Sequence, residues 1–336
     1  MTAPLVTVIM PVRNEAAFIH RALGAVLAQD YAPLEVLVVD GGSTDDTISI
    51  VKSIAKTDPR TRLLHNNGTI QARALNVGIE HARGDVIVRV DGHALIAPDY
   101  VRRCVHHLQT TGADNVGGPQ RCVGITPTGR AIAAAYRSPF GVPSQFTTSE
   151  KAGYVDTVYM GAWPREVFER VGHFNPDLAI NEDYEHNVRI RRAGGRVYLA
   201  PDIRAEYYGR QSFAALARQY FRYGQGKARM LAQHPGSIRA RHMAAPAFVA
   251  GLAGGALLAP FVKPVRVLWG GLLLAYALAN GIASLAAARH AGRATWRLPG
   301  VFATIHLAWG SGFWHGVLRY ARHGVFRPQI PSSQKS

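Results

Sequence analysis

Cysteine and acidic residues are both scarce in this sequence. Its 336 residues include two cysteines, Cys104 and Cys122, which excludes a disulfide-stabilised scaffold and favours a reduced compartment. We expect both thiols to be buried apolar side chains rather than reactive groups. Asp and Glu number 22 against 38 Lys and Arg, for a formal net charge of +16. Such an excess favours an anionic partner, namely a phosphorylated substrate, acidic lipid headgroups or nucleic acid.

Several sequence signals are missing. The basic residues are spread out rather than gathered in one block, so no nucleic-acid-binding tail and no nucleic-acid partner are expected. The apolar run 5–12 has no basic segment before it and continues into Arg13-Asn14-Glu15. It is therefore expected to be a strand rather than a signal peptide, with the N-terminal domain in the cytoplasm. A Walker A loop, a glycine-rich dinucleotide loop, a His-Glu-x-x-His motif and a nucleophile elbow are also missing.

The first part of the chain alternates between apolar runs and amphipathic segments. Strands are expected at 6–12, 34–39, 62–65 and 85–90, with helices near 19–27, 48–54 and 70–82. This alternation with short connections predicts an α/β fold with a parallel, doubly wound sheet. Residues 112–158 are rich in turn formers and predict loops. Short helices at 168–174 and 182–193 and a strand at 196–200 are expected to follow.

Two carboxylates come where predicted strands end. In an open α/β sheet, ligands bind beyond the carboxyl ends of the strands. Asp40 can accept a hydrogen bond from the N3–H of uracil, and residues 11–15 would form the opposite wall of that site. Gly42 lets the backbone approach a ligand closely. The alternative is a plain Asp-Gly turn in which Ser43 or Asp45 caps the next helix.

Asp91 and His93 are separated by one residue, so in an extended chain both side chains face the same way. Together they can hold a divalent ion that bridges a diphosphate. Oxygen ligands favour Mg²⁺, and an imidazole shifts the preference towards Mn²⁺. The alternative is an acid that ends a strand next to a surface histidine.

Glu182 and Asp183 open a predicted helix. One of them can act as a general base on an acceptor hydroxyl, a role that contributes about 10²–10⁴ in rate. The alternative is structural, because the helix dipole favours acids in the first turn.

The C-terminal third combines a basic, aromatic helix with apolar segments. Residues 212–232 have the pattern of an amphipathic helix on an anionic membrane, whose arginines can also bind phosphate. A helix with a solvated face is the alternative. Apolar segments at 244–262, 267–288 and 299–318 predict two or three membrane segments within 243–320. The alternative is a buried soluble helical subdomain. Gly251-x-x-x-Gly255 and Gly312-x-x-x-Gly316 would permit close helix contact.

Together these motifs resemble glycosyltransferase family 2, and the chain is similar to the succinoglycan-type exopolysaccharide glycosyltransferases with C-terminal membrane helices. His93 stands where the family has the second acid of Asp-x-Asp, and Tyr223 stands where polymerising members have Trp. The matching segments are Pro11-Val12-Arg13-Asn14-Glu15, Asp40-Gly41-Gly42-Ser43-Thr44-Asp45, Gln71 to Gly78, Asp91-Gly92-His93, Glu182-Asp183 and Gln219-x-x-Arg222-Tyr223.

The resemblance implies a GT-A fold, a mostly parallel sheet flanked by helices, in residues 1–235. It implies that Asp183 is the catalytic base beside Glu182, and that Asp91 and His93 hold Mg²⁺ or Mn²⁺. The implied nucleotide-sugar-binding residues are Pro11, Arg13, Asn14, Glu15, Asp40, Gly42, Arg73, Asp91, Gln219, Arg222 and Tyr223.

The resemblance also implies a function. It implies an inverting enzyme on the cytoplasmic face of the inner or plasma membrane, which moves a sugar from a UDP-sugar to a polyprenyl-diphosphate-linked glycan. The product would serve cell-surface or exopolysaccharide synthesis. Two alternatives remain open: a synthase that places sugar on polyprenyl phosphate, and a catalytically silent membrane protein that binds nucleotide sugar.

Overall fold

The computed structural model describes residues 3–66, 68–141, 147, 151–233 and 240–322, and these form two compact units. The boundary lies between Gln211 and Ser212, and the short segment Arg289–Ala294 groups with the first unit. Residues 212–232, which the sequence analysis expects within the catalytic domain, lie in the second unit of this division, and the domain bounds stay a prediction. Residue 235, the predicted end of that domain, lies outside the described residues.

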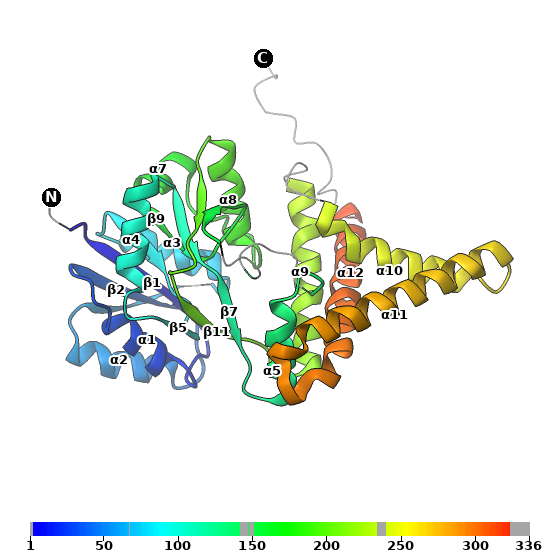
Figure 1. Ribbon diagram of the computed structural model, residues 1–336. Coiled ribbons are helices and arrows are strands. Elements are labelled where there is room, and N and C mark those ends of the chain that lie inside the picture. Colours follow the sequence, from blue (N-terminus) through cyan, green and yellow to red (C-terminus); the bar gives the residue numbers. More distant parts are fainter. Residues whose placement is uncertain (1–2, 67, 142–146, 148–150, 234–239, 323–336) are drawn as a thin grey trace, which may run out of the picture. The chain divides into compact units, whose positions relative to one another are not determined.

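The N-terminal unit (Figure 1) is built on a mixed sheet. Its described strands have the order β3-β2-β1-β4-β9-β6-β10-β8. The strands β3, β2, β1 and β4 run parallel, β9 is antiparallel to both β4 and β6, and β8 is antiparallel to β10. Their bounds are β1 Val6–Val12, β2 Leu34–Asp40, β3 Thr61–His65, β4 Val86–Arg89, β6 Asn115–Gly118, β8 Gly153–Tyr154, β9 Tyr159–Pro164 and β10 Val197–Leu199.

Helices cover this sheet, and a small second sheet lies beside it. Every residue of β1 and β2 is buried, as expected for parallel strands covered on both faces. The small sheet has the order β5-β11-β7, with β5 Ala94–Ile96, β11 Ala205–Tyr208 and β7 Gln120–Val123. The helices are α1 Ile19–Leu27, α2 Thr47–Thr57, α3 Gln71–His81, α4 Tyr100–Thr111, α5 Pro127–Tyr136, α7 Glu166–Val171 and α8 Glu182–Arg192.

The predicted α/β alternation is confirmed over the first four strands. The region 112–158, predicted as loops, is more regular than expected and contains β6, β7, α5 and β8. Both cysteines are buried, as predicted. Burial raises the pKa of the Cys104 thiol, and it raises that of Cys122 to about 12.

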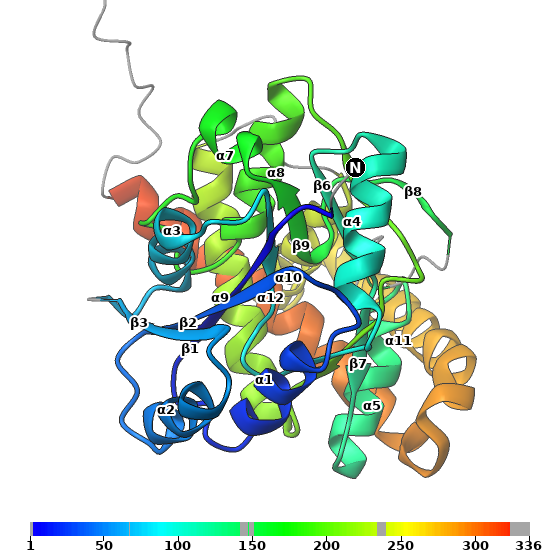
Figure 2. The same cartoon turned by 90° about the vertical axis from the view of Figure 1, so that its left-hand side faces the viewer.

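The described chain after Ser212 is helical, with α9 Phe213–Gln233, α10 Ala240–Leu258, α11 Lys263–Ala291, the 3₁₀ segment η2 Gly292–Arg297 and α12 Leu298–Arg322. The two helices α9 and α12 run alongside each other (Figures 1 and 2). A Cβ atom at Gly312 would clash with the backbone of Phe221, and one at Gly255 would clash with the ring of Trp269. The expected close packing at both glycine motifs is therefore confirmed.

One described helical stretch, Lys263–Ala321, is long and apolar enough to cross a membrane; it comprises α11, η2 and most of α12. Only 17% of its apolar 18-residue segment is buried, and large apolar side chains along α11 are exposed. These are Val267, Leu268, Leu273, Leu274, Leu278, Ile282 and Leu285.

Candidate active site

The carboxyl ends of β2, β1 and β4 meet at one edge of the sheet, where the strand order reverses around β1. In the register, Val12 pairs with Asp40 and Ile9 pairs with Arg89. Asp91 follows Arg89 by two residues, so Asp40 and Asp91 flank the end of β1 from either side. This is the position at which open α/β sheets bind ligands. The neighbouring order β3-β2-β1 is visible in Figure 2.

A buried arginine joins two of the predicted acids. The guanidinium of Arg89 donates through Nε to Asp91 Oδ1 at 2.7 Å and through Nη1 to Glu182 Oε1 at 3.0 Å. Gln71 at the start of α3 also donates to Asp91 Oδ1, at 3.2 Å. The N-terminus of α8 is thereby held next to the end of β4, although about 90 residues separate them in the sequence.

The cluster carries surplus negative charge, because one guanidinium faces Asp91 and Glu182 with Asp183 close by. Burial raises the pKa of Glu182 to about 7, with the charges of Asp183 and Asp91 acting in the same direction and Arg89 opposing them. Burial alone would also raise the pKa of Asp91, but Arg89 and His93 outweigh it and the pKa is lowered. A site of this charge is suited to a cation.

Glu182 and Asp183 differ in their surroundings. Glu182 is buried and paired with Arg89, whereas Asp183 is only half-buried. One carboxylate oxygen of Asp183 accepts the backbone N–H of Tyr184 at 2.7 Å. Asn181, directly before them, has a φ of +64°, so the chain turns sharply before it enters α8. Of the two acids, Asp183 is the one more open to an acceptor.

His93 pairs with Glu15, another predicted site residue. Its Nδ1 lies 2.8 Å from Glu15 Oε1, and Glu15 is fixed in turn by a hydrogen bond from its backbone N–H to Thr47 Oγ1. Burial alone would lower the pKa of His93, but Glu15 and Asp91 outweigh it and the pKa is raised. This pairing favours the imidazolium form, which must lose its proton before the ring can bind a metal.

The donor set fits a cation that shares its coordination with a substrate. Among the described residues, no group of three or more His, Cys, Asp or Glu is arranged to hold a metal ion. Mg²⁺ is commonly bound through one or two carboxylates together with substrate phosphates. Asp91, next to surplus negative charge, satisfies this requirement, while His93 would need to release its proton.

The loop after β2 is tied to the loop after β1. Asp40 is buried, and its carboxylate accepts the backbone N–H groups of Gly42 at 3.0 Å and Ser43 at 3.2 Å. Gly42 has a φ of +82°, a conformation that favours glycine. Asn14, with a φ of +55°, accepts the N–H of Thr44 at 2.8 Å. The Asp40 carboxylate is therefore fixed in direction, and lone pairs remain for a ligand.

The remaining predicted residues divide into two groups. Arg73 on α3 donates to the carbonyl of Pro176 at 3.2 Å and so reaches the loop before α8. Pro11 is buried at the end of β1, and Arg13 is exposed directly after it. Gln219, Arg222 and Tyr223 belong to the C-terminal unit, so their contribution to the site stays a prediction.

Two residues of the cluster were not predicted from the sequence. Gln71 begins a segment that matches the family but was not assigned to the site. Arg89 gave a local signal, because it is a charged residue within the apolar run Val86-Ile87-Val88-Arg89-Val90. A charge in a buried strand has to be paired. Its partners could have been sought among the acids that the motifs had already singled out.

Comparison with known proteins agrees with this fold. The chain resembles the solved mannosyltransferase PcManGT from Pyrobaculum calidifontis, in complex with GDP-Man and Mn²⁺, with a TM-score of 0.63 and 23% identity over 95% of this chain and 88% of that chain. The N-terminal unit accordingly has the GT-A fold. Residues 7–172 match the family model described as Glycosyl transferase family 2.

Relatives in sequence extend the match over nearly the whole chain. Identity is 33% over 328 residues with the succinoglycan biosynthesis protein ExoA of Rhizobium meliloti (strain 1021), covering 96% of this chain and 98% of that protein. A dolichyl N-acetyl-alpha-D-glucosaminyl phosphate 3-beta-D-2,3-diacetamido-2,3-dideoxy-beta-D-glucuronosyltransferase of Methanococcus voltae is 26% identical over 67% of this chain and 74% of that protein. The chain belongs to glycosyltransferase family 2, and it is a glycosyltransferase of polysaccharide biosynthesis.

Proposed function

We propose that this protein is a membrane-associated, inverting enzyme that transfers a sugar from a UDP-sugar to a hydroxyl of a polyprenyl-diphosphate-linked glycan. The observation that carries the proposal is the Arg89 cluster, in which a buried guanidinium joins Asp91 to Glu182 at the edge where Asp40 also lies. The acids that we assign to donor binding and to acceptor activation are therefore close to one edge of the same sheet.

The donor is assigned to the end of the sheet around β1. In the proposal, Asp40 accepts from the uracil N3–H, and Pro11, Arg13 and Asn14 form the facing wall. Gly42 lets the loop approach the nucleotide, and Arg73 contacts phosphate. Gln219 and Tyr223 are proposed as further donor contacts from the C-terminal unit, and Arg222 is proposed as a phosphate contact. The GDP-Man bound to the structural neighbour supports a nucleotide-sugar donor.

Asp91 would hold the divalent cation, Mg²⁺ or Mn²⁺, with His93 after the imidazolium has lost its proton to Glu15 or solvent. The cation would supply charge neutralisation for the departing diphosphate. The Mn²⁺ in the structural neighbour and the surplus negative charge around Arg89 support this assignment.

Asp183 is the proposed general base. It takes the proton of the acceptor hydroxyl while that oxygen forms a bond to the anomeric carbon, and the bond from that carbon to the donor diphosphate breaks. A single displacement inverts the anomeric configuration and releases UDP. Glu182, held by Arg89, positions the first turn of α8 and with it Asp183.

A lipid-linked acceptor at the cytoplasmic face of the inner or plasma membrane is supported by charge and composition. The net charge is +16, and the stretch Lys263–Ala321 is long and apolar. In the proposal, α9 lies at the membrane–water interface, and residues 243–320 form the membrane-associated region. The name of the Methanococcus voltae relative specifies a dolichyl phosphate sugar, which also supports a lipid-linked acceptor.

The test is transfer by the full-length protein, with a panel of nucleotide sugars and membrane-extracted lipid acceptors read by mass spectrometry. We expect Asp183→Asn to lower kcat by about 10²–10⁴, because the amide cannot accept the proton. Glu166→Gln is the matched control, since Glu166 is an exposed acid in the first turn of another helix. A well-folded Asp183→Asn variant with wild-type kcat would remove Asp183 from this role.

A further inference from the structure

The C-terminal unit contains a groove along the seam between α9 and α12, and its volume is about 690 Å³. This volume is within the range of small-molecule pockets. The groove is lined from α9 by Ala217, Arg218, Phe221, Arg222 and Gln225, and from α12 by Thr304, Leu307, Ala308 and Ser311. Both sets recur at helical spacing, so each helix presents one continuous face to the groove.

The charge in the groove is of one sign. Arg218 and Arg222 are one helical turn apart, and both are exposed. Within the described part of the chain, neither makes an ion pair or a hydrogen bond, and none of the lining residues is acidic. Two adjacent guanidinium groups without protein partners are suited to a phosphate.

The rest of the lining is apolar. Phe221, Leu307 and the two alanines form walls next to the arginines, and Leu307 is 42% exposed in the open groove. Free phosphate would gain nothing from these walls, and a neutral hydrocarbon would leave the arginines unpaired. A ligand that satisfies both parts has an anionic head and a hydrocarbon chain.

We infer that this groove binds a prenyl-linked phosphate, with the phosphate at Arg218 and Arg222 and the first prenyl units against Phe221 and Leu307. The inference rests on the proposed function for the identity of the lipid, which is the carrier of the glycan acceptor. It adds a specific site for that carrier, formed by α9 and α12.

Binding can be measured without catalysis, by calorimetric titration of the full-length protein in detergent and EDTA. The probes are farnesyl phosphate, inorganic phosphate and farnesol, which separate head from chain. We expect farnesyl phosphate to bind more tightly than either part alone. We expect Arg218→Gln to weaken its binding about tenfold through loss of a charge-assisted hydrogen bond, and Ala308→Phe to prevent binding by filling the groove.

Two matched controls account for general effects. Arg319→Gln removes an exposed arginine of α12 outside the groove, and Ala286→Phe enlarges an exposed alanine of α11. Both should bind farnesyl phosphate like the wild type, and partition of the probe into micelles should be the same for all variants. Because Arg218 is exposed, its substitution is not expected to prevent folding.

Three outcomes would overturn the inference. One is equal binding of farnesyl phosphate by the wild type and Arg218→Gln; another is inorganic phosphate binding as tightly as farnesyl phosphate, which would indicate a simple anion site. The third is displacement of the probe by an equal concentration of phosphatidylglycerol, which would indicate a general membrane contact.

Transfer assays separate this inference from the proposed function. Arg218→Gln should raise the KM for the lipid acceptor about tenfold while the KM for the donor stays unchanged. A protein that binds farnesyl phosphate in the groove but never transfers sugar would contradict only the proposed function. If Arg218→Gln transfers sugar with an unchanged KM for the lipid acceptor, only the assignment of the groove to the lipid carrier is contradicted.

Discussion

At the scale of single residues, Arg89 has the largest expected effect on both stability and activity. Replacing it with Met would leave Asp91 and Glu182 buried without their cation, so we expect a loss of about 3–5 kcal/mol in the free energy of unfolding and loss of transfer. Arg89→Lys keeps the charge but not the fork that reaches both acids, and it should be intermediate. Chemical denaturation and transfer assays measure both effects.

Arg60→Met is the control for Arg89. Its ion pair with Asp58 is at the surface, where the arginine side chain is 40% exposed, so the change should cost less than about 1 kcal/mol. Equal stability of Arg89→Met and Arg60→Met would show that the buried cluster does not hold β4 to α8.

Glu182 should make stability depend on pH. Burial raises its pKa from 4.5 to about 7 in the folded protein, so between these values the folded state keeps a proton that the unfolded state releases. Stability from this group is therefore complete below about pH 4.5 and is lost as the pH rises towards 7. From pH 4.5 to 7.5, we expect the melting temperature of the wild type to fall relative to that of Glu182→Gln, because the variant has no carboxyl group to titrate at this position. Melting temperatures that change with pH in parallel in the two proteins would contradict this prediction.

The candidate site residues could be predicted where a few consecutive residues of the sequence carry the signal. Asp40 and Asp91 follow apolar runs, and Glu182-Asp183 opens a helix, so each was visible in the sequence. Their convergence depends on Arg89, which spans 93 positions to reach Glu182. The pairing of His93 with Glu15 was equally hidden, because it depends on how the ends of two strands lie in space.

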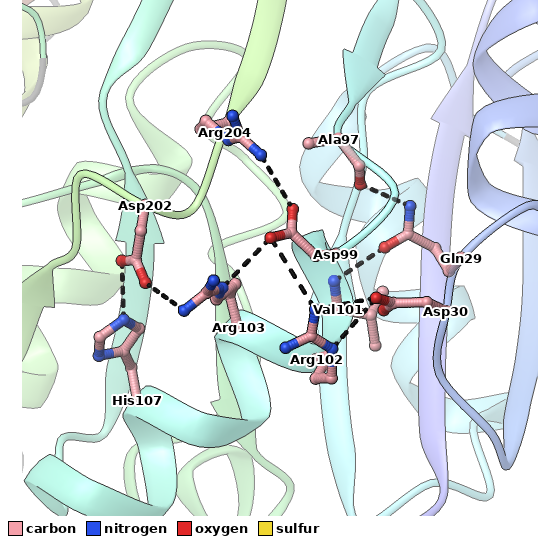
Figure 3. A network of polar contacts seen from close by, with 10 residues as sticks. All are labelled: Gln29, Asp30, Ala97, Asp99, Val101, Arg102, Arg103, His107, Asp202 and Arg204. Atoms are coloured by element: carbon pink, nitrogen blue, oxygen red, sulfur yellow. Dashed lines mark hydrogen bonds and ion pairs between the residues drawn. The ribbon is translucent and has the colours of Figure 1, made fainter.

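At the scale of elements, a polar network fixes the segment that follows His93 (Figure 3). Gln29 donates to the carbonyl of Ala97 at 2.8 Å and accepts the N–H of Val101 at 2.9 Å, which anchors α4 to the end of α1. In the same network, Asp99 pairs with Arg103, and Asp202 pairs with Arg103 and His107.

Gln29→Leu should destabilise the protein by about 1–3 kcal/mol, because two backbone groups lose their partner in a buried position. Thermal or chemical unfolding measures the change. Arg102→Ala is the control, since its ion pair with Asp30 is exposed on both sides and should contribute less than about 1 kcal/mol. A Gln29→Leu variant as stable as Arg102→Ala would disprove the anchoring role.

The elements themselves were predictable where the pattern was periodic. The four parallel strands and their helices follow apolar runs of the expected length. The antiparallel β9 was not predicted, because Tyr159-Met160-Gly161-Ala162-Trp163-Pro164 contains two positive φ angles, at Met160 and Gly161. Its insertion between β4 and β6 depends on long-range packing, which no local pattern contains.

At the scale of the whole molecule, the apolar surface of α11 should decide how the protein fractionates. We expect the wild type to stay with membranes after alkaline carbonate extraction. Leu278→Arg together with Ile282→Arg should release part of it, because an arginine in the middle of a membrane helix costs about 2.5–3.5 kcal/mol. The matched control is the same change at two exposed positions of the N-terminal unit, Ile125→Arg and Tyr154→Arg. Wild-type protein found entirely in the soluble fraction would contradict membrane association.

The burial of Cys104 and Cys122 provides a practical route to the topology of the C-terminal helices. Both thiols are shielded from water, and burial raises both pKa values, so thiolate-specific reagents should leave the native chain unlabelled. A single cysteine introduced at the start or end of α11 would then be the only reactive site. Its labelling by a membrane-impermeant maleimide in intact and opened cells would report on which side of the bilayer each helix end lies.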